Sequence, residues 1–125
     1  MNGLIGFEPD ENLRYKWIIE KMLYFCELQP KNVFIQLCAF DPYDNYDMNV
    51  YSGSYLDEHF DNHMKNEWMV DEFDIILGNP PYQDSSNGSS KGTGNTLWNH
   101  FVEKSVSQLK KSGYLVYVHP SGWRN

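Results

Sequence analysis

The sequence predicts an α/β fold built on a parallel β-sheet, and three observations predict it. Short apolar runs alternate along the chain with longer segments whose apolar residues recur every three or four positions. The runs are nearly continuous, which is typical of strands covered on both faces of a sheet. Each run stops at a polar residue beside a proline, so these polar residues are expected at one edge of the sheet, where ligands bind. The 125 residues suffice for one domain with one core.

The N-terminal part of the chain predicts a strand and then a helix. Residues 3–7 (GLIGF) form an apolar run that stops at Glu8, as a buried strand followed by an acidic loop would. Apolar residues at helical spacing then predict a helix over residues 12–28, with Asp10 or Asn12 as its N-cap. Pro30 stops this helix, which would cross from the first strand to the second.

The second predicted strand is followed by a segment without a clear period. Residues 32–40 (NVFIQLCAF) are rich in β-favouring side chains and stop at Asp41. Residues 42–72 are rich in Asp, Asn, Tyr and His, so we expect a loop-rich insertion with a short helix around residues 56–65. The two acids that end the predicted strands are candidates for ligand binding.

The C-terminal half predicts strand, loop, helix and strand. Residues 73–77 form a third apolar run, and residues 84–95 (DSSNGSSKGTGN) are rich in Ser and Gly, which predicts a mobile loop. Helical periodicity returns over residues 97–109, and residues 114–118 form a fourth strand. Alternation of this kind implies parallel strands joined by helical crossovers.

The charge of the chain disfavours a free-standing nucleic-acid binder. Its 10 basic and 17 acidic residues give a formal charge of −7, which repels a phosphate backbone over most of the surface. Half of the basic residues nevertheless lie in the last part of the chain, where a local basic strip is expected: Lys91, Lys104, Lys110, Lys111 and Arg124.

Composition also bears on compartment and on metal binding. No apolar stretch approaches the roughly 18 residues that span a bilayer, and the N-terminus lacks the basic start of a secretion signal, so we expect a cytoplasmic protein without a membrane partner. Cys26 and Cys38 are expected to be buried, reduced thiols. His59 and His63 lie four residues apart but have no evident third ligand, so we expect surface histidines and no metal site.

The third strand leads directly into Asn-Pro-Pro-Tyr at residues 79–82. Pro80 and Pro81 fix two backbone angles and remove two N–H donors, which leaves rigid carbonyl acceptors. Asn79 adds a side-chain carbonyl, and Tyr82 adds an aromatic face on the same turn. Two acceptors beside a flat ring suit a planar group that carries an NH₂, such as the exocyclic amino group of a base. A plain tight turn after a strand is the alternative interpretation.

This stretch, FDIILGNPPYQ, resembles the catalytic motif of S-adenosylmethionine-dependent amino methyltransferases. It is most similar to adenine-specific DNA methyltransferases of restriction-modification systems. Three further stretches resemble strand ends of the same family, and together they cover most of the chain apart from the insertion: GFEPD at 6–10, FDPY at 40–43 and SGYLVYVHPSGWRN at 112–125.

The resemblance implies a catalytic role for the Asn-Pro-Pro-Tyr turn. A target adenine is flipped out of DNA, and its amino hydrogens are held by the Asn79 side chain and the Pro80 carbonyl, with Pro81 stiffening the turn. Tyr82 stacks on the base. The amino nitrogen then takes the methyl group of the cofactor by direct displacement, without a covalent enzyme intermediate.

The resemblance also implies a cofactor site and a fold. Glu8 would bind the ribose hydroxyls of S-adenosylmethionine, Asp41 would contact its adenine amino group, and Asn79 would adjoin it. The family's fold is a Rossmann-like parallel sheet, and this chain lacks its first strand with the Gly-containing cofactor loop. We therefore expect residues 1–125 to be a partial catalytic domain, truncated at both ends, whose partners are DNA and the remainder of the enzyme or a target-recognition domain.

Two other functions remain open from the sequence. Glutamine methyltransferases that act on release factors resemble the chain in the same Asn-Pro-Pro-Tyr turn. Gln83 leads here into a polar loop, which favours a nucleic-acid target. The net charge and the missing cofactor loop suit a third function, that of a non-catalytic remnant of a methyltransferase fold that acts as a binding module.

Overall fold

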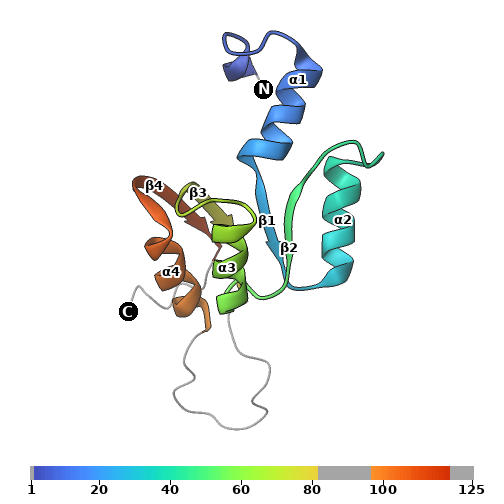
Figure 1. Cartoon of the computed structure of the whole chain (residues 1–125). Helices are drawn as coiled ribbons and strands as arrows, with labels where there is room; N and C mark the ends of the chain where they lie inside the picture. The colour runs from blue at the N-terminus through green and yellow to red at the C-terminus, as the bar shows by residue number, and fades with distance from the viewer. Residues whose placement is uncertain (1, 82–96, 119–125) are drawn as a thin grey trace, which may run out of the picture. The chain divides into compact units, whose positions relative to one another are not determined.

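The computed structural model describes residues 2–81 and 97–118 and forms two compact units, residues 1–63 and 64–125 (Figure 1). Each unit is mixed α/β and contains one two-stranded parallel sheet. The boundary between the units falls within a helix. An α/β fold with parallel strands is therefore confirmed, whereas one partial catalytic domain stays a prediction.

The described elements follow one another along the chain in two groups, one in each unit. The first unit contains η1 (Asn2–Leu4), α1 (Glu11–Trp17), the π-helical turn η2 (Ile18–Met22), β1 (Tyr24–Glu27), α2 (Pro30–Phe40), β2 (Asn49–Ser52) and the start of α3 (Glu58–Asn66). The second unit contains the end of α3, β3 (Phe73–Gly78), α4 (Leu97–Ser107) and β4 (Leu109–Tyr117).

The predicted strand at residues 3–7 is wrong. The segment forms η1 and a turn, in which the backbone N–H groups of Phe7 and Glu8 both donate to the Leu4 carbonyl at 2.9 Å. A strand needs a neighbour for its backbone groups, and none of the described strands pairs with this segment. Phe7 accordingly remains 67% exposed. Hydrogen bonds within a local turn are thus formed here in place of the strand pairing that the apolar pattern predicted.

The predicted helix over residues 12–28 is correct only in its first part. Its N-cap is Asp10, which accepts a hydrogen bond from the Leu13 N–H at 3.0 Å, as expected for a helix start. The helix continues through η2 and ends at Met22, after which residues 24–27 form β1. Tyr24, Phe25 and Cys26 favour a strand once β2 is available as a partner.

The predicted strand at residues 32–40 is also wrong, because these residues form α2. Pro30 occupies the first turn of α2, a position where its fixed φ angle and missing N–H suit a helix start. The sequence analysis treated this proline as a stop for the preceding helix. An apolar run of this length fits a strand or a packed helix equally well by periodicity. In the helical conformation, the ring of Phe40 packs on Phe25 of β1, with ring centres 5.0 Å apart.

The region predicted as a loop-rich insertion, residues 42–72, contains one strand that the sequence analysis missed. β2 runs parallel to β1, in a register that pairs Tyr24 with Asn49 and Glu27 with Ser52. α2 joins the two strands and lies beside both of them (Figure 1). The short helix expected around residues 56–65 is confirmed as α3.

The second unit agrees with the sequence analysis. β3, α4 and β4 lie where a strand, a helix and a strand were predicted, although β4 begins earlier, at Leu109. Phe73 pairs with Leu109 and Ile75 with Tyr114, so β4 bulges between these pairs. Gly113 sits in the bulge, where an added Cβ would lie 3.0 Å from the Asp74 carbonyl oxygen. The predicted mobile loop at 84–95 lies outside the described residues.

The two faces of the β3–β4 sheet differ. Ile75 and Leu77 pair with Tyr114 and Val116, and these four side chains are between 57% and 72% exposed. The intervening positions Ile76, Leu115 and Tyr117 are half-buried, and Tyr117 bonds to α4. The expectation of a sheet covered on both faces is therefore not met in the described part of this unit.

Two smaller expectations can be compared with the structure. Both cysteines are free thiols, as predicted, but Cys38 is exposed on α2 and Cys26 only half-buried. The described residues include no helix that is long and apolar enough to cross a bilayer.

Candidate functional site

The predicted catalytic turn begins where β3 ends. Gly78 is the last residue of β3, and its carbonyl oxygen accepts a hydrogen bond from the Val118 N–H at 3.0 Å. Asn79 follows with an exposed side chain, Pro80 is buried and Pro81 is exposed. Tyr82 lies outside the described residues. The turn is thus anchored by one buried ring and presents the asparagine to solvent.

The chemistry available at this turn is hydrogen-bond acceptance. The Asn79 side chain makes no hydrogen bond within residues 2–81 and 97–118. The two prolines have no backbone N–H groups, so the backbone offers no donor at these two positions that could bond to the acceptor oxygens. An exposed carboxamide oxygen beside a proline carbonyl suits a ligand NH₂ group, which has two hydrogens to donate.

A second set of polar groups lies at the carboxyl ends of β1 and β2. The Gly53 N–H donates to the Glu27 carbonyl at 2.9 Å, which joins the two strand ends. The Glu27 carboxylate accepts from the Gln29 N–H through Oε1 at 2.9 Å, and its Oε2 has no hydrogen-bond partner among the described residues. Ser54 accepts from the Leu56 N–H at 3.3 Å. One carboxylate oxygen is therefore available to a ligand hydroxyl at this edge.

Sequence reasoning missed Glu27 as a strand-end acid. The signal was present, because FCELQP contains the same order of apolar run, acid and proline that singled out Glu8. It was hidden by the helix predicted through residue 28.

Glu8 does not lie at the end of a strand, so its predicted place is wrong. It lies in the turn before α1, where Oε1 accepts from the Asp10 N–H at 3.0 Å. Its backbone carbonyl accepts from the buried Arg14 guanidinium at 2.9 Å. These contacts fix the chain entering α1. The cofactor role of Glu8 stays a prediction that has lost its structural premise.

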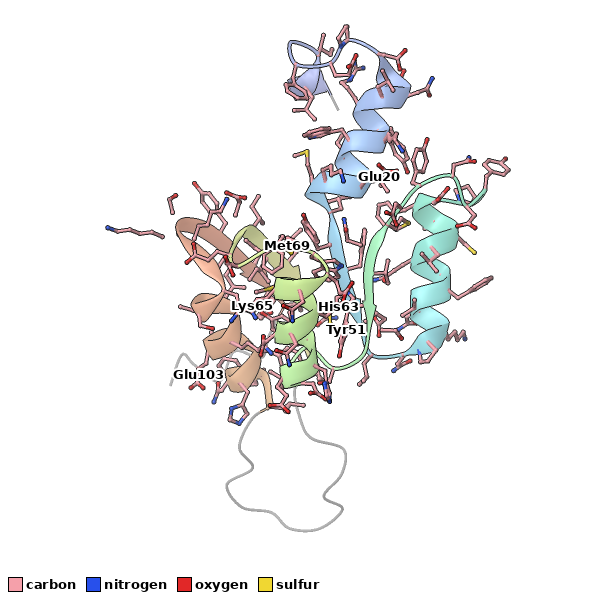
Figure 2. The ribbon with its side chains drawn as sticks, viewed as in Figure 1. Glu20, Tyr51, His63, Lys65, Met69 and Glu103 are labelled. Carbon is pink, nitrogen blue, oxygen red and sulfur yellow. The ribbon has the colours of Figure 1, made fainter. Side chains whose placement is uncertain are left out.

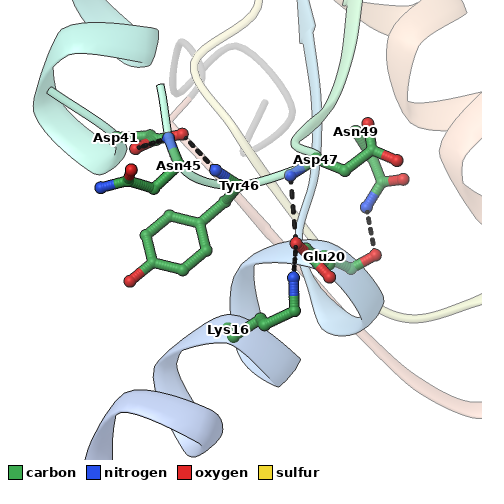
Figure 3. A network of polar contacts seen from close by, with 7 residues as sticks. All are labelled: Lys16, Glu20, Asp41, Asn45, Tyr46, Asp47 and Asn49. Atoms are coloured by element: carbon green, nitrogen blue, oxygen red, sulfur yellow. Dashed lines mark hydrogen bonds and ion pairs between the residues drawn. The ribbon is translucent and has the colours of Figure 1, made fainter. Parts of the chain in front are cut away.

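Asp41 follows a helix and not a strand, and it too is misplaced by the sequence analysis. It is 8% exposed and forms the C-cap of α2. Its Oδ1 accepts from the Asn45 N–H at 2.9 Å and its Oδ2 from the Tyr46 N–H at 2.7 Å (Figure 3). Both oxygens thus close the loop that follows α2, and a contact with the cofactor stays a prediction.

Glu20 ties the same loop to η2 (Figure 3). Its carboxylate accepts from Lys16 Nζ at 2.6 Å and from the Asp47 N–H at 3.2 Å. The Lys16 hydrogen bond, followed by the Asp47 amide, lowers the pKa of Glu20 below its usual value. Asn49 adds two bonds from its side-chain amide, to the Glu20 and Leu23 carbonyls at 3.0 Å each. This network sets the approach of the chain to β2.

The two histidines on α3 have different surroundings. Figure 2 shows His63 beside Tyr51 of β2, with ring centres 5.1 Å apart, whereas His59 is exposed. Burial, with the nearby Asp57 carboxylate, raises the pKa of Tyr51. Among the residues that the structure describes, no group of three His, Cys, Asp or Glu side chains could hold a metal ion.

Comparisons with known proteins show which family and which relative the chain is similar to. Residues 18–125 match the family model described as Eco57I restriction-modification methylase. The chain is also 29% identical, over 104 residues, to an uncharacterized adenine-specific methylase of Mycoplasma pneumoniae. That match covers 82% of this chain but 23% of the relative's length. No solved structure matches the chain.

Proposed function

Because the chain belongs to the Eco57I restriction-modification methylase family, we propose that it forms part of an enzyme that methylates the exocyclic amino group of adenine in DNA. The observation that carries this proposal is the turn after β3, where Asn79 is exposed without a partner in the described chain and Pro80 is buried. The relative's name, an adenine-specific methylase, supports the choice of base.

In the proposed reaction the turn acts by positioning and by hydrogen bonding. The Asn79 side-chain oxygen and the Pro80 carbonyl accept the two amino hydrogens of a flipped adenine. Holding both hydrogens directs the nitrogen lone pair away from the turn. S-adenosylmethionine, when bound, would supply an electrophilic methyl group whose bond to sulfur breaks as the bond to nitrogen forms, and the nitrogen would release one of its two hydrogens as a proton. The protein contributes orientation and acceptor groups, and it forms no covalent bond to the base.

We assign the ribose-binding acid of the proposed cofactor site to Glu27 in place of Glu8. Glu27 ends a parallel strand beside the start of α2, and ligands of parallel α/β sheets bind at that edge. Its Oε2 is available to accept from a hydroxyl group, which is the chemistry a ribose offers. Asp41 is a weaker candidate, because backbone amides occupy both of its carboxylate oxygens.

The proposal extends to the fold and to the partners. We propose that the whole enzyme contains a Rossmann-like parallel sheet and further segments, because the chain spans about a quarter of the length of the relative it matches. Those segments or a target-recognition domain would add basic surface for DNA to a chain whose net charge is −7. We propose a cytoplasmic location for the enzyme, because its proposed substrate is cellular DNA.

The test is a methyl-transfer assay with radiolabelled S-adenosylmethionine and the protein encoded by the complete open reading frame. Its substrates are genomic DNA of mixed sequence and, in parallel, a release-factor protein. We expect label in DNA, recovered after digestion as N6-methyladenine. Label in the protein substrate would instead establish a glutamine methyltransferase. Cofactor binding without transfer to either substrate would leave a binding module and refute the proposed activity.

A further inference from the structure

We infer that Tyr117 and Ser105 are positioning residues for the acceptor groups of Asn79 and Pro80, acting through Gly78. The inference deepens the proposed function and rests on it, because it names residues that hold the catalytic turn without touching the substrate. All the contacts that carry it lie within the second unit, among β3, α4 and β4.

The first contact is steric. Gly78 and Tyr117 are direct cross-strand partners, and the tyrosine ring lies over the glycine Cα. A Cβ on Gly78 would be 2.7 Å from Cε1 of that ring and 3.2 Å from Cδ1. Real carbon atoms do not approach so closely, so only glycine accommodates the ring in this position. The ring therefore fixes how near the end of β3 lies to β4.

The second contact fixes the ring itself. The Tyr117 hydroxyl and the Ser105 hydroxyl are 2.5 Å apart, and Ser105 is fully buried on α4. A buried hydroxyl is costly unless it is paired, and the bond between these two groups joins the Tyr117 ring to α4. Apolar side chains would fill the same space without fixing the direction of the ring. The hydroxyl pair thus orients the ring.

The third contact continues to the catalytic turn. The Val118 N–H, next in sequence to Tyr117, donates to the Gly78 carbonyl at 3.0 Å. That carbonyl belongs to the peptide group that joins Gly78 to Asn79. The residue before the catalytic turn is consequently held by the backbone of β4, by the Tyr117 ring and, through the ring, by α4. Displacements of about 1 Å in such a support change rates by about 100-fold.

The main experiment changes Gly78 in the protein encoded by the complete open reading frame. We expect Gly78→Ala to lower kcat for methyl transfer by about 100-fold while the KM for S-adenosylmethionine changes less than about threefold. Adding Tyr117→Val to Gly78→Ala removes the ring that the new Cβ meets, and we expect at least about tenfold of kcat to return. The matched control is Gly6→Ala, because a Cβ on Gly6 meets nothing within 4 Å.

A second series tests the hydroxyl pair. We expect Tyr117→Phe and Ser105→Ala each to lower kcat by about tenfold, and the double variant to lose less than the product of the two single losses, because the two hydroxyls share one bond. Tyr114→Phe is the control, since Tyr114 lies on the same strand but is 70% exposed. An unchanged kcat in Gly78→Ala, or equal kcat in Tyr117→Phe and Tyr114→Phe, would overturn the inference.

Amide hydrogen exchange of residues 73–81 in the same proteins separates this inference from the proposed function. We expect faster exchange in Gly78→Ala and Tyr117→Phe, slower exchange again in Gly78→Ala with Tyr117→Val, and no change in either control. A wild-type protein with no methyl transfer would refute the proposed function. The exchange pattern would still decide whether Tyr117 and Ser105 hold the turn after β3 in place. Wild-type exchange rates in all variants would refute this positioning role of Tyr117 and Ser105.

Discussion

The two parallel sheets end in contrasting ways at their carboxyl edges. At the β1–β2 edge the polar groups largely satisfy one another, because Gly53 bonds to Glu27, Glu27 to Gln29 and Ser54 to Leu56. At the β3–β4 edge two prolines remove donors, and the Asn79 side chain has no hydrogen-bond partner in the described chain. The first edge therefore uses most of its polar groups in its own turns and leaves one Glu27 carboxylate oxygen without a partner among the described residues, whereas the second leaves the whole Asn79 carboxamide without one.

A glycine lies close to a tyrosine ring at both edges, but the two contacts connect different numbers of elements. Gly53 directly follows β2 and lies beside Tyr51 of that strand, where an added Cβ would be 2.7 Å from Cε1, so that contact is local. Gly78 lies under Tyr117 of the neighbouring strand, and this ring is bonded to a helix. The same pair of residue types therefore shapes one strand end in the first case and connects three elements in the second.

The largest effect that would break this contrast concerns Glu27. If the β1–β2 edge binds the cofactor through one free carboxylate oxygen, Glu27→Gln weakens S-adenosylmethionine binding by about 100-fold, or about 2.7 kcal/mol, as expected for a hydrogen bond to a charged group. Calorimetry on the protein encoded by the complete open reading frame measures it, with the exposed Glu58→Gln as control. A comparable loss in Glu8→Gln and none in Glu27→Gln would restore the assignment made from sequence.

The loop that Asp41 closes gives the next largest effect. Asp41→Ala leaves the Asn45 and Tyr46 amides without their carboxylate acceptor, so we expect the free energy of unfolding to fall by about 2 kcal/mol. Chemical denaturation measures the change. Asp47→Ala is the control, because that side chain is exposed and only its backbone N–H is used. Equal stability of the two variants would show that the Asp41 carboxylate is not needed for the loop.

Gly53→Ala sharpens the comparison of the two glycines. Its Cβ would meet the Tyr51 ring, which also packs on Phe60 and His63, so we expect a loss of about 1 to 1.5 kcal/mol in stability. The kcat per folded molecule should stay within about threefold of wild type, in contrast to Gly78→Ala. Thermal unfolding and methyl transfer are measured together, and a fall in kcat as large as that of Gly78→Ala would erase the distinction between the edges.

The smallest effect is a pH dependence at Glu20. Its pKa is lower in the folded than in the unfolded protein, so the ionised carboxylate stabilises the fold above the unfolded pKa of about 4.5. That stabilisation is lost as the pH falls through the lowered folded-state pKa. Glu20→Gln should therefore reduce stability by less than about 1 kcal/mol near pH 7, and the difference from wild type should shrink near pH 3. A difference that grows on acidification would contradict the network in Figure 3.

The second unit could be predicted from the sequence more fully than the first. β3, α4 and β4 have unambiguous periods, and the family resemblance found in FDIILGNPPYQ is confirmed by the match over residues 18–125. In the first unit, Pro30 was interpreted as the end of a helix, whereas it begins α2. Residues 32–40 were therefore predicted as a strand, although they are helical. Periodicity alone does not separate the two for a short apolar run.

The candidate site was predictable to the same unequal degree. Asn79 and Pro80 lie directly after a strand, because prolines end a strand wherever it lies in the fold. The cofactor acids depended on which segments are strands, so the errors at residues 3–7 and 32–40 moved the assignments to Glu8 and Asp41. Only pairing with β2, a tertiary contact, identifies β1 and with it Glu27.

Replacing Asn79 by alanine in the protein encoded by the complete open reading frame tests the central claim most directly. We expect methyl transfer to adenine to fall by about 10²- to 10³-fold, as when one preorganised polar group of a catalytic site is removed, with cofactor affinity nearly unchanged. Asn62→Ala, another exposed asparagine, should keep wild-type transfer. Normal transfer by Asn79→Ala would contradict the account, because the exposed carboxamide after β3 would then have no part in the reaction.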